Sequence, residues 1–154
     1  MRPRSSALFT RLQGPSGHRQ VWTTFGPDQV DVNWRHPEVL LGFVRLLKQK
    51  LSHGVRWIRL DAVGFVWKEP HTDCIHRPEA HQLVEVLRYL MSHVCGDGGV
   101  VVTETNVPEQ ENLSYLRSGR EAHLAYNFPL PPLLLEATIS GSADLLNSWL
   151  ARWP

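Results

Sequence analysis

Three charged residues in the middle of the chain have types and spacings that could do chemistry. Arg59 and Asp61 are separated by one residue in the apolar segment IRLDAVGF, so an extended backbone points both side chains to the same face. A neighbouring guanidinium keeps a carboxylate ionised, which suits a nucleophile. A structural ion pair near a strand end explains the same two residues equally well, and spacing alone does not decide between these interpretations.

A second carboxylate, Glu104, ends the apolar run VVVTE. In parallel α/β folds, ligands bind at the carboxyl ends of strands, so Asp61 and Glu104 on neighbouring strands would face one cavity. Such a pair can cleave a glycosidic bond with retention, because one carboxylate attacks the anomeric carbon while the other protonates the leaving oxygen. Taken alone, Glu104 fits a cap or loop carboxylate better.

The histidines and aromatic residues are less informative. His71, His76 and His81 are spaced five residues apart, which does not match the spacing of three or four expected of metal ligands on a helix, so the sequence predicts no metal site. His76 is interpreted as a loop residue near the mouth of the site. Three of the six tryptophans lie in or beside expected loops, where an indole can stack on a sugar or fill the core. They are Trp22, Trp34 and Trp67.

The elements that must position these residues alternate between helices and strands. Apolar residues at spacings of three and four predict helices, while Val- and Ile-rich runs predict strands, the first of them buried on both faces. Helices are expected at 37–53 and 78–94, one broken or two short helices at 131–153, and strands at 56–62, 100–104 and 124–128, with a polar loop at 108–121. This order predicts an α/β fold with a parallel sheet and helices packed outside.

Residues 1–36 contain several Pro and Gly residues, and only the segment VWTTF (21–25) looks like a short strand. We interpret this part as a loop or small subdomain that leans on the rest. The change of pattern at Pro37, which suits the first position of a helix, marks the boundary with the helix and strand alternation.

The composition excludes several function classes. A formal net charge of +1 for 154 residues predicts no nucleic-acid partner, and no segment approaches the length of a membrane span. The two cysteines, Cys74 and Cys95, are too few for a disulfide framework and lack zinc spacing. With no apolar stretch of signal-peptide length at the start, the sequence predicts a cytoplasmic protein with reduced thiols.

Together, five segments of the chain resemble the α-amylase clan of glycoside hydrolases, and within it the subfamily of sucrose phosphorylase and glucosylglycerate phosphorylase. The resemblance extends from Arg2 onward, and its ordered spacing makes it specific, whereas RLDA alone would not be. The segments are VWTTFGPDQVDVN (21–33), IRLDAVGFVWKEP (58–70), WKEPHTDCIHRPE (67–79), VVTETNVPEQENLSYL (101–116) and EAHLAYNFPLPPLLLEA (121–137).

The resemblance implies a role for each matching residue. Asp61 becomes the nucleophile, Glu104 the general acid/base, and Arg59 the residue that keeps the nucleophile charged. Phe25 becomes an aromatic platform for the glucosyl ring, and Gln29 lies near the acceptor side. The implied reaction is phosphorolysis of an α-glucoside to α-glucose 1-phosphate, with inorganic phosphate as co-substrate and no cofactor.

One position separates the branches of the subfamily. Sucrose phosphorylases typically have His two residues after the acid/base, whereas Asn106 occupies that position here. The sequence TETNVP resembles that of the glucosylglycerate phosphorylase branch. Asn106 is therefore a third candidate substrate-binding residue.

A complete (β/α)₈ barrel takes about 250 residues. We therefore expect a fragment of such a barrel, with 1–36 as part of an inserted loop subdomain and 37–154 as part of the catalytic barrel. The alternatives to a phosphorylase are a catalytically inactive fragment and an α-glucosidase that uses water.

Overall fold

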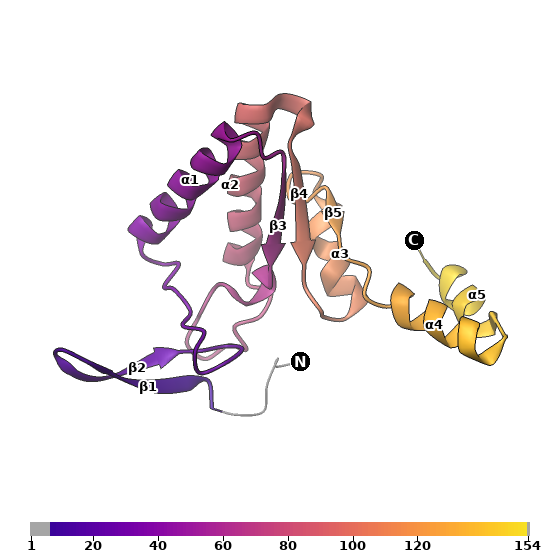
Figure 1. The fold of residues 1–154 in the computed structure, drawn as a ribbon, viewed down its shortest axis with the longest axis horizontal. Helices are drawn as coiled ribbons and strands as arrows, with labels where there is room; N and C mark the ends of the chain where they lie inside the picture. The colour runs from indigo at the N-terminus through magenta and orange to yellow at the C-terminus, as the bar shows by residue number, and fades with distance from the viewer. Residues whose placement is uncertain (1–6, 154) are drawn as a thin grey trace.

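A parallel sheet flanked by helices forms the centre of the molecule (Figure 1). The computed structural model describes residues 7–153. The sheet contains β3 (Trp57–Asp61), β4 (Val100–Glu104) and β5 (Leu124–Ala125), in the order β3-β4-β5, and both pairings are parallel. The three predicted strands are confirmed, although β5 is shorter than expected.

Two long helices follow the predicted stripes closely. α1 (Pro37–Ser52) and α2 (Pro78–Cys95) each begin with a proline, whose missing N–H would have no partner in the first turn. Their apolar faces pack with the sheet and with α3 (Glu109–Arg117) into one core. Burying each large aliphatic side chain contributes about 1.5–3 kcal/mol. The core residues are Leu47, Leu51, Val63, Val84, Leu87, Met91, Val101, Tyr115 and Ala122.

The sheet has one covered face and one open face. Along β3, Ile58 and Leu60 pack against the core, whereas Trp57, Arg59 and Asp61 are exposed, and the Trp57 side chain is 63% exposed. The prediction that this strand is buried on both faces is therefore wrong for the chain as described. The apolar residues on the open face fit the lumen of a closed barrel, which the side chains of all its strands fill.

The N-terminal part forms a hairpin that extends away from the sheet in Figure 1. β1 (Phe9–Gly14) pairs antiparallel with β2 (Gly17–Trp22), and the Phe9 and Trp22 rings meet edge to face at 4.9 Å. The expected strand at 21–25 thus begins earlier and ends at Trp22. β1 was missed because its sequence FTRLQG lacks a clear alternation of apolar and polar residues.

Helix α3 corrects the prediction of a polar loop at 108–121. Its mean hydropathy is low, but Tyr115 is fully buried and Asn112 almost so. Glu109 and Glu111 lie in its first turn, where carboxylates interact favourably with the helix dipole. Two anchored side chains and a favourable first turn therefore hold a helix that periodicity alone does not reveal.

The last residues form two short helices, one of the two predicted arrangements. α4 (Leu130–Ser140) and α5 (Asp144–Leu150) project away from the sheet (Figure 1) and contain no buried residue. Two single-turn 3₁₀ helices complete the elements, η1 (Val63–Phe65) after β3 and η2 (Gly96–Gly98) before β4. Between residues 7 and 153, no helix has the length and apolar character that crossing a membrane requires.

Candidate active site

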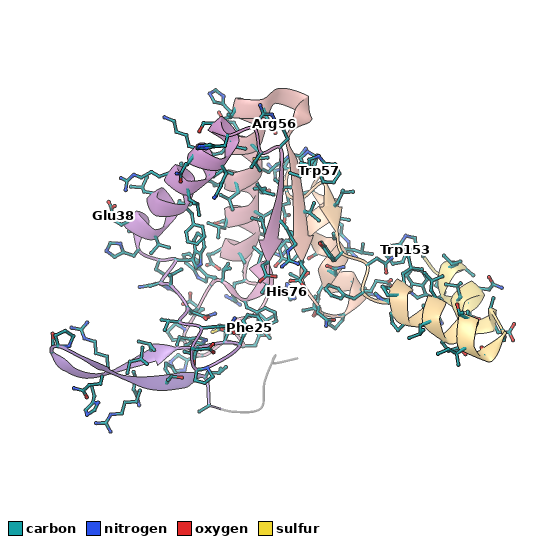
Figure 2. The ribbon with its side chains drawn as sticks, in the orientation of Figure 1. Phe25, Glu38, Arg56, Trp57, His76 and Trp153 are labelled. Carbon is teal, nitrogen blue, oxygen red and sulfur yellow. The ribbon has the colours of Figure 1, made fainter. Side chains whose placement is uncertain are left out.

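Asp61 and Glu104 lie side by side at the carboxyl ends of neighbouring strands. They are paired positions in the parallel β3–β4 register, so their side chains emerge on the same face. The Ala62 N–H donates to the Glu104 backbone carbonyl at 2.8 Å and approaches the Glu104 Oε2 at 3.4 Å. In Figure 2, Phe25 and His76 lie near this end of the sheet, and Arg56 lies at the opposite end.

The Ala62 contacts depend on an unusual backbone conformation. Ala62 has φ 49° and ψ 32°, in the left-handed region that residues with a side chain rarely adopt. This conformation turns the chain sharply from β3 into η1 and directs the Ala62 N–H toward Glu104. Such local strain is common at active sites, where the surrounding structure holds it in place.

Arg59 gives the Asp61 carboxylate a charged partner. An Arg59 guanidinium nitrogen lies 2.8 Å from Asp61 Oδ1, and the guanidinium carbon lies 5.7 Å from the centre of the Tyr126 ring. A side-chain hydrogen bond with Tyr126, and then the charge of Asp61, raise the pKa of Arg59. The predicted pairing of Arg59 with Asp61 is thus present, and Tyr126 is a partner that the sequence did not reveal.

The surroundings of Glu104 raise the pKa of its carboxyl group. A hydrogen bond with the Asp61 side chain is the largest cause that raises the pKa of Glu104, followed by burial, while the Ala62 N–H lowers it. Two carboxyl groups this close favour a state in which one of them keeps its proton. The geometry therefore allows one carboxyl to donate a proton while its neighbour, beside Arg59, acts as a nucleophile.

A hollow of about 330 Å³ opens beside Asp61, at the lower end of the size range of ligand pockets. Its wall combines the segment after β2 with the segment after β3 and one residue of α1. The lining residues are Phe25, Val30, Asp31, Val32, Trp34, Phe43, Asp61, Ala62, Phe65 and Val66. The predicted Phe25 and Asp61 therefore line the same hollow. Trp34, which was not predicted there, also lines it, and the centre of its ring lies 4.5 Å from that of Phe43.

The other two predicted binding residues lie outside this hollow. Gln29 is exposed, and its backbone N–H bonds to the Gly26 carbonyl in a turn. Asn106 is exposed in the loop that follows β4, two residues after Glu104. Neither residue lines the space beside Asp61.

The loop after Glu104 is fixed by a buried hydrogen-bond network. The Thr105 hydroxyl donates to Asn112 Oδ1 at 2.7 Å, and Asn112 Nδ2 donates to the Tyr126 carbonyl at 2.8 Å. Thr105 and Asn112 are almost completely buried. The side-chain amide of Asn112 therefore connects the end of β4 to the end of β5. Tyr126, which follows β5, also contacts Arg59.

His76 packs against the η1 segment that follows β3 and Asp61. Its backbone N–H donates to the Gly64 carbonyl at 2.8 Å, and its Nδ1 lies 2.9 Å from the Tyr115 hydroxyl. Burial is the largest cause that lowers the pKa of His76. His76 is a loop residue, as predicted, and its ring packs against Gly64 of η1 without lining the hollow beside Asp61.

Among the described residues, no three His, Cys, Asp or Glu side chains form a group that could hold a metal ion. Cys74 and Cys95 are both free. The site chemistry visible in the structure is therefore that of two carboxyl groups, a guanidinium and an aromatic hollow.

Several curated proteins are similar to this chain in amino-acid sequence. It is 46% identical over 151 residues to the glucosylglycerate phosphorylase of Allomeiothermus silvanus, covering 97% of this chain and 27% of the relative. The corresponding enzyme of Escherichia coli is 45% identical, with 96% and 27% covered. The sucrose phosphorylase of Bifidobacterium adolescentis is 29% identical, with 96% and 28% covered. The chain thus spans about a quarter of the length of these relatives.

Solved structures and a family profile agree with this result. The sucrose 6F-phosphate phosphorylase of Thermoanaerobacter thermosaccharolyticum superposes with a TM-score of 0.82 at 25% identity, over 100% of this chain and 32% of that one. The predicted fragment of a (β/α)₈ barrel is confirmed, and the described sheet is open and not a closed barrel. Residues 18–151 match the profile described as alpha amylase, catalytic domain. The chain therefore belongs to the alpha-amylase catalytic-domain family.

Proposed function

We propose that this chain carries the nucleophile and the acid/base of a retaining α-glucoside phosphorylase of the glucosylglycerate type. The pairing of Asp61 with Glu104 across β3 and β4 is the observation that carries the proposal. The names of the more similar relatives support the substrate class, since glucosylglycerate phosphorylases are 45–46% identical and a sucrose phosphorylase is 29% identical. Asn106 after Glu104 points to the same branch.

In the proposed first step, an Asp61 carboxylate oxygen attacks the anomeric carbon as the bond to the leaving oxygen breaks. Glu104 gives its proton to that oxygen, so the acceptor departs as an alcohol and a glucosyl ester of Asp61 remains. Phe25 and Trp34 provide aromatic surfaces beside the attacking carboxylate, which suits the apolar face of a sugar ring.

In the second step, a phosphate oxygen attacks the same carbon and the Asp61 carboxylate leaves. Glu104 takes the proton that the phosphate loses, which restores both residues and gives α-glucose 1-phosphate. Two inversions retain the configuration. The predicted absence of a cofactor and a cytoplasmic location, where phosphate would be available, are part of this proposal.

The test places this chain within a complete barrel from a related enzyme. In an exchange enzyme, the segment of the Escherichia coli glucosylglycerate phosphorylase that matches this chain over 150 residues is replaced by the chain. With phosphate present, we expect glucose 1-phosphate from glucosylglycerate and much less from sucrose. Asp61→Asn should lower kcat by about three orders of magnitude or more, since it removes a member of a catalytic unit.

The products distinguish the alternatives. Free glucose in place of glucose 1-phosphate would identify a hydrolase that uses water. A folded exchange enzyme with no turnover of either kind would identify an inactive catalytic segment and would contradict the proposal.

A further inference from the structure

Lys68 holds two walls of the hollow together without lining it. Its ammonium lies 2.7 Å from Asp31 Oδ2 and donates to the Thr24 hydroxyl at 3.1 Å and to the Phe65 carbonyl. The Lys68 nitrogen also lies 5.3 Å from the centre of the Trp22 ring. The Lys68 and Asp31 side chains are each only 20% exposed. We call Lys68, Asp31, Thr24 and the Phe65 carbonyl the Lys68 clamp.

The clamp closes the loop that follows β2. Asp31 Oδ1 accepts from the Thr24 N–H at 3.2 Å, and the Asp31 N–H donates to the Trp22 carbonyl at 2.9 Å. The Thr24 hydroxyl donates to Asp31 Oδ2 and accepts from Lys68 and from Trp22 Nε1. Every donor of the ammonium and the hydroxyl therefore has an acceptor, and the two ends of residues 22–31 are held side by side.

This loop carries one wall of the hollow, and the segment after β3 carries the other. Phe25, in the loop, meets the Phe65 ring edge to face at 5.5 Å, and both residues line the hollow beside Asp61. Lys68 bonds to the loop through Asp31 and Thr24, and to the other wall through the Phe65 carbonyl. The Lys68 ammonium therefore joins the loop that carries Phe25 to the segment after β3, alongside the direct contact between the Phe25 and Phe65 rings.

We propose that Lys68 is a positioning residue that sets the distance between the Phe25 wall and Asp61, and so determines how tightly the glucosyl ring is held. The inference rests on the proposed function for the identity of the ligand. Lys68 does not line the hollow, so its effect on binding passes through Phe25. Removing the ammonium would leave the Asp31 carboxylate partly buried without its cation, which favours opening of the loop.

The first test measures the loop itself. Amide hydrogen exchange is followed in the exchange enzyme, for wild type, Lys68→Met and Lys50→Met, which replaces an exposed lysine on α1. We expect Lys68→Met to speed exchange of the Thr24 and Asp31 amides at least about tenfold, the effect of losing a hydrogen bond to a charged group. Lys50→Met should leave both amides unchanged. Unchanged exchange in Lys68→Met would overturn the inference.

The second test measures binding through a kinetic cycle in the exchange enzyme. Lys68→Met should raise KM for the glucoside about tenfold and change kcat by less than about threefold, because ground-state and transition-state binding fall together. In a Phe25→Ala background, Lys68→Met should add little, because the residue through which it acts is gone.

Two results would contradict the positioning role of Lys68, and a third would contradict the proposed function. Additive losses in the Phe25→Ala background, or an unchanged KM in a variant whose loop exchanges faster, would refute the positioning role. An exchange enzyme with wild-type sequence that lacks phosphorolysis would instead refute the proposed function, while the hydrogen-exchange measurement still decides whether the clamp holds the loop.

Discussion

At the scale of single residues, the candidate site depends on two carboxyl groups at paired positions of β3 and β4. Asp61 and Glu104 could be predicted because each ends an apolar run, and strand ends in parallel sheets meet at one edge. Tyr126 and Lys68 could not, because their contacts join segments far apart in the sequence. Neither residue belongs to a local pattern, and only the fold brings each to its partner.

The raised pKa of Glu104 has a consequence for stability. The folded protein binds this proton more tightly than the unfolded chain does, so the associated stabilisation is full below the unfolded pKa and is lost as the pH rises through the folded pKa. Glu104→Gln stays neutral at every pH. In the exchange enzyme it should therefore match wild type at acid pH and be more stable at neutral pH.

The gain in Tm at neutral pH should be about one degree, because exposed charge pairs contribute ~0.2–1 kcal/mol. Thermal unfolding at both pH values measures it. Glu111→Gln is a comparison variant: it removes a carboxylate in the first turn of α3, which interacts favourably with the helix dipole, so it should lose stability at neutral pH and not gain it. A Glu104→Gln variant that is less stable than wild type at neutral pH would contradict the electrostatic account.

At the scale of elements, β3 and the turn after it determine the site. The helices α1 and α2 could be predicted within about two residues because a single apolar stripe defines each. The faces of β3 could not, because an apolar composition is the same whether a strand lies in a closed barrel or borders an open one. Helix α3 was missed because two buried side chains, Asn112 and Tyr115, replace the usual stripe.

Alanine substitutions of Gly64, in the turn after β3, and of Gly42, in α1, should change the stability in opposite directions. A Cβ on Gly64 would lie 2.6 Å from His76 Cε1, and the His76 ring is held by Tyr115, so Gly64→Ala should destabilise the protein by about 1–3 kcal/mol. Gly42, in the exposed part of α1, has nothing within 4 Å, so Gly42→Ala should stabilise by up to about 1 kcal/mol.

Chemical denaturation of both variants in the exchange enzyme measures these changes. Equal effects of the two substitutions would show that His76 does not pack tightly beneath η1. A loss of activity in Gly64→Ala that exceeds its loss of stability would show that the turn also positions Asp61.

At the scale of the whole molecule, the described chain leaves much apolar surface uncovered. Large side chains are exposed on the open sheet face and on the projecting helices, including Trp57 at 63%, Leu135 at 61% and Ile139 at 77%. Within residues 7–153, β3 pairs only with β4, so its other edge offers unpaired backbone groups. Open edges and apolar patches of this kind promote aggregation.

Expressed alone, the 154-residue chain should therefore bind a hydrophobic dye, associate with itself and show no measurable glucoside turnover. Light scattering, dye fluorescence and a glucose 1-phosphate assay check the three expectations, with the exchange enzyme as the folded reference. A monodisperse chain that melts cooperatively and releases glucose 1-phosphate would contradict this view of the molecule.

The central claim is that Asp61 attacks the anomeric carbon while Glu104 donates a proton to the leaving oxygen. Trapping the covalent intermediate tests this claim most directly. A fluorinated α-glucosyl fluoride loses fluoride to the nucleophile and leaves a slowly hydrolysed glucosyl ester. After proteolysis of the treated exchange enzyme, mass spectrometry should find the added fluoroglucosyl mass on Asp61, and Asp61→Asn should show none. The same mass on another residue, or undiminished labelling in Asp61→Asn, would contradict the account.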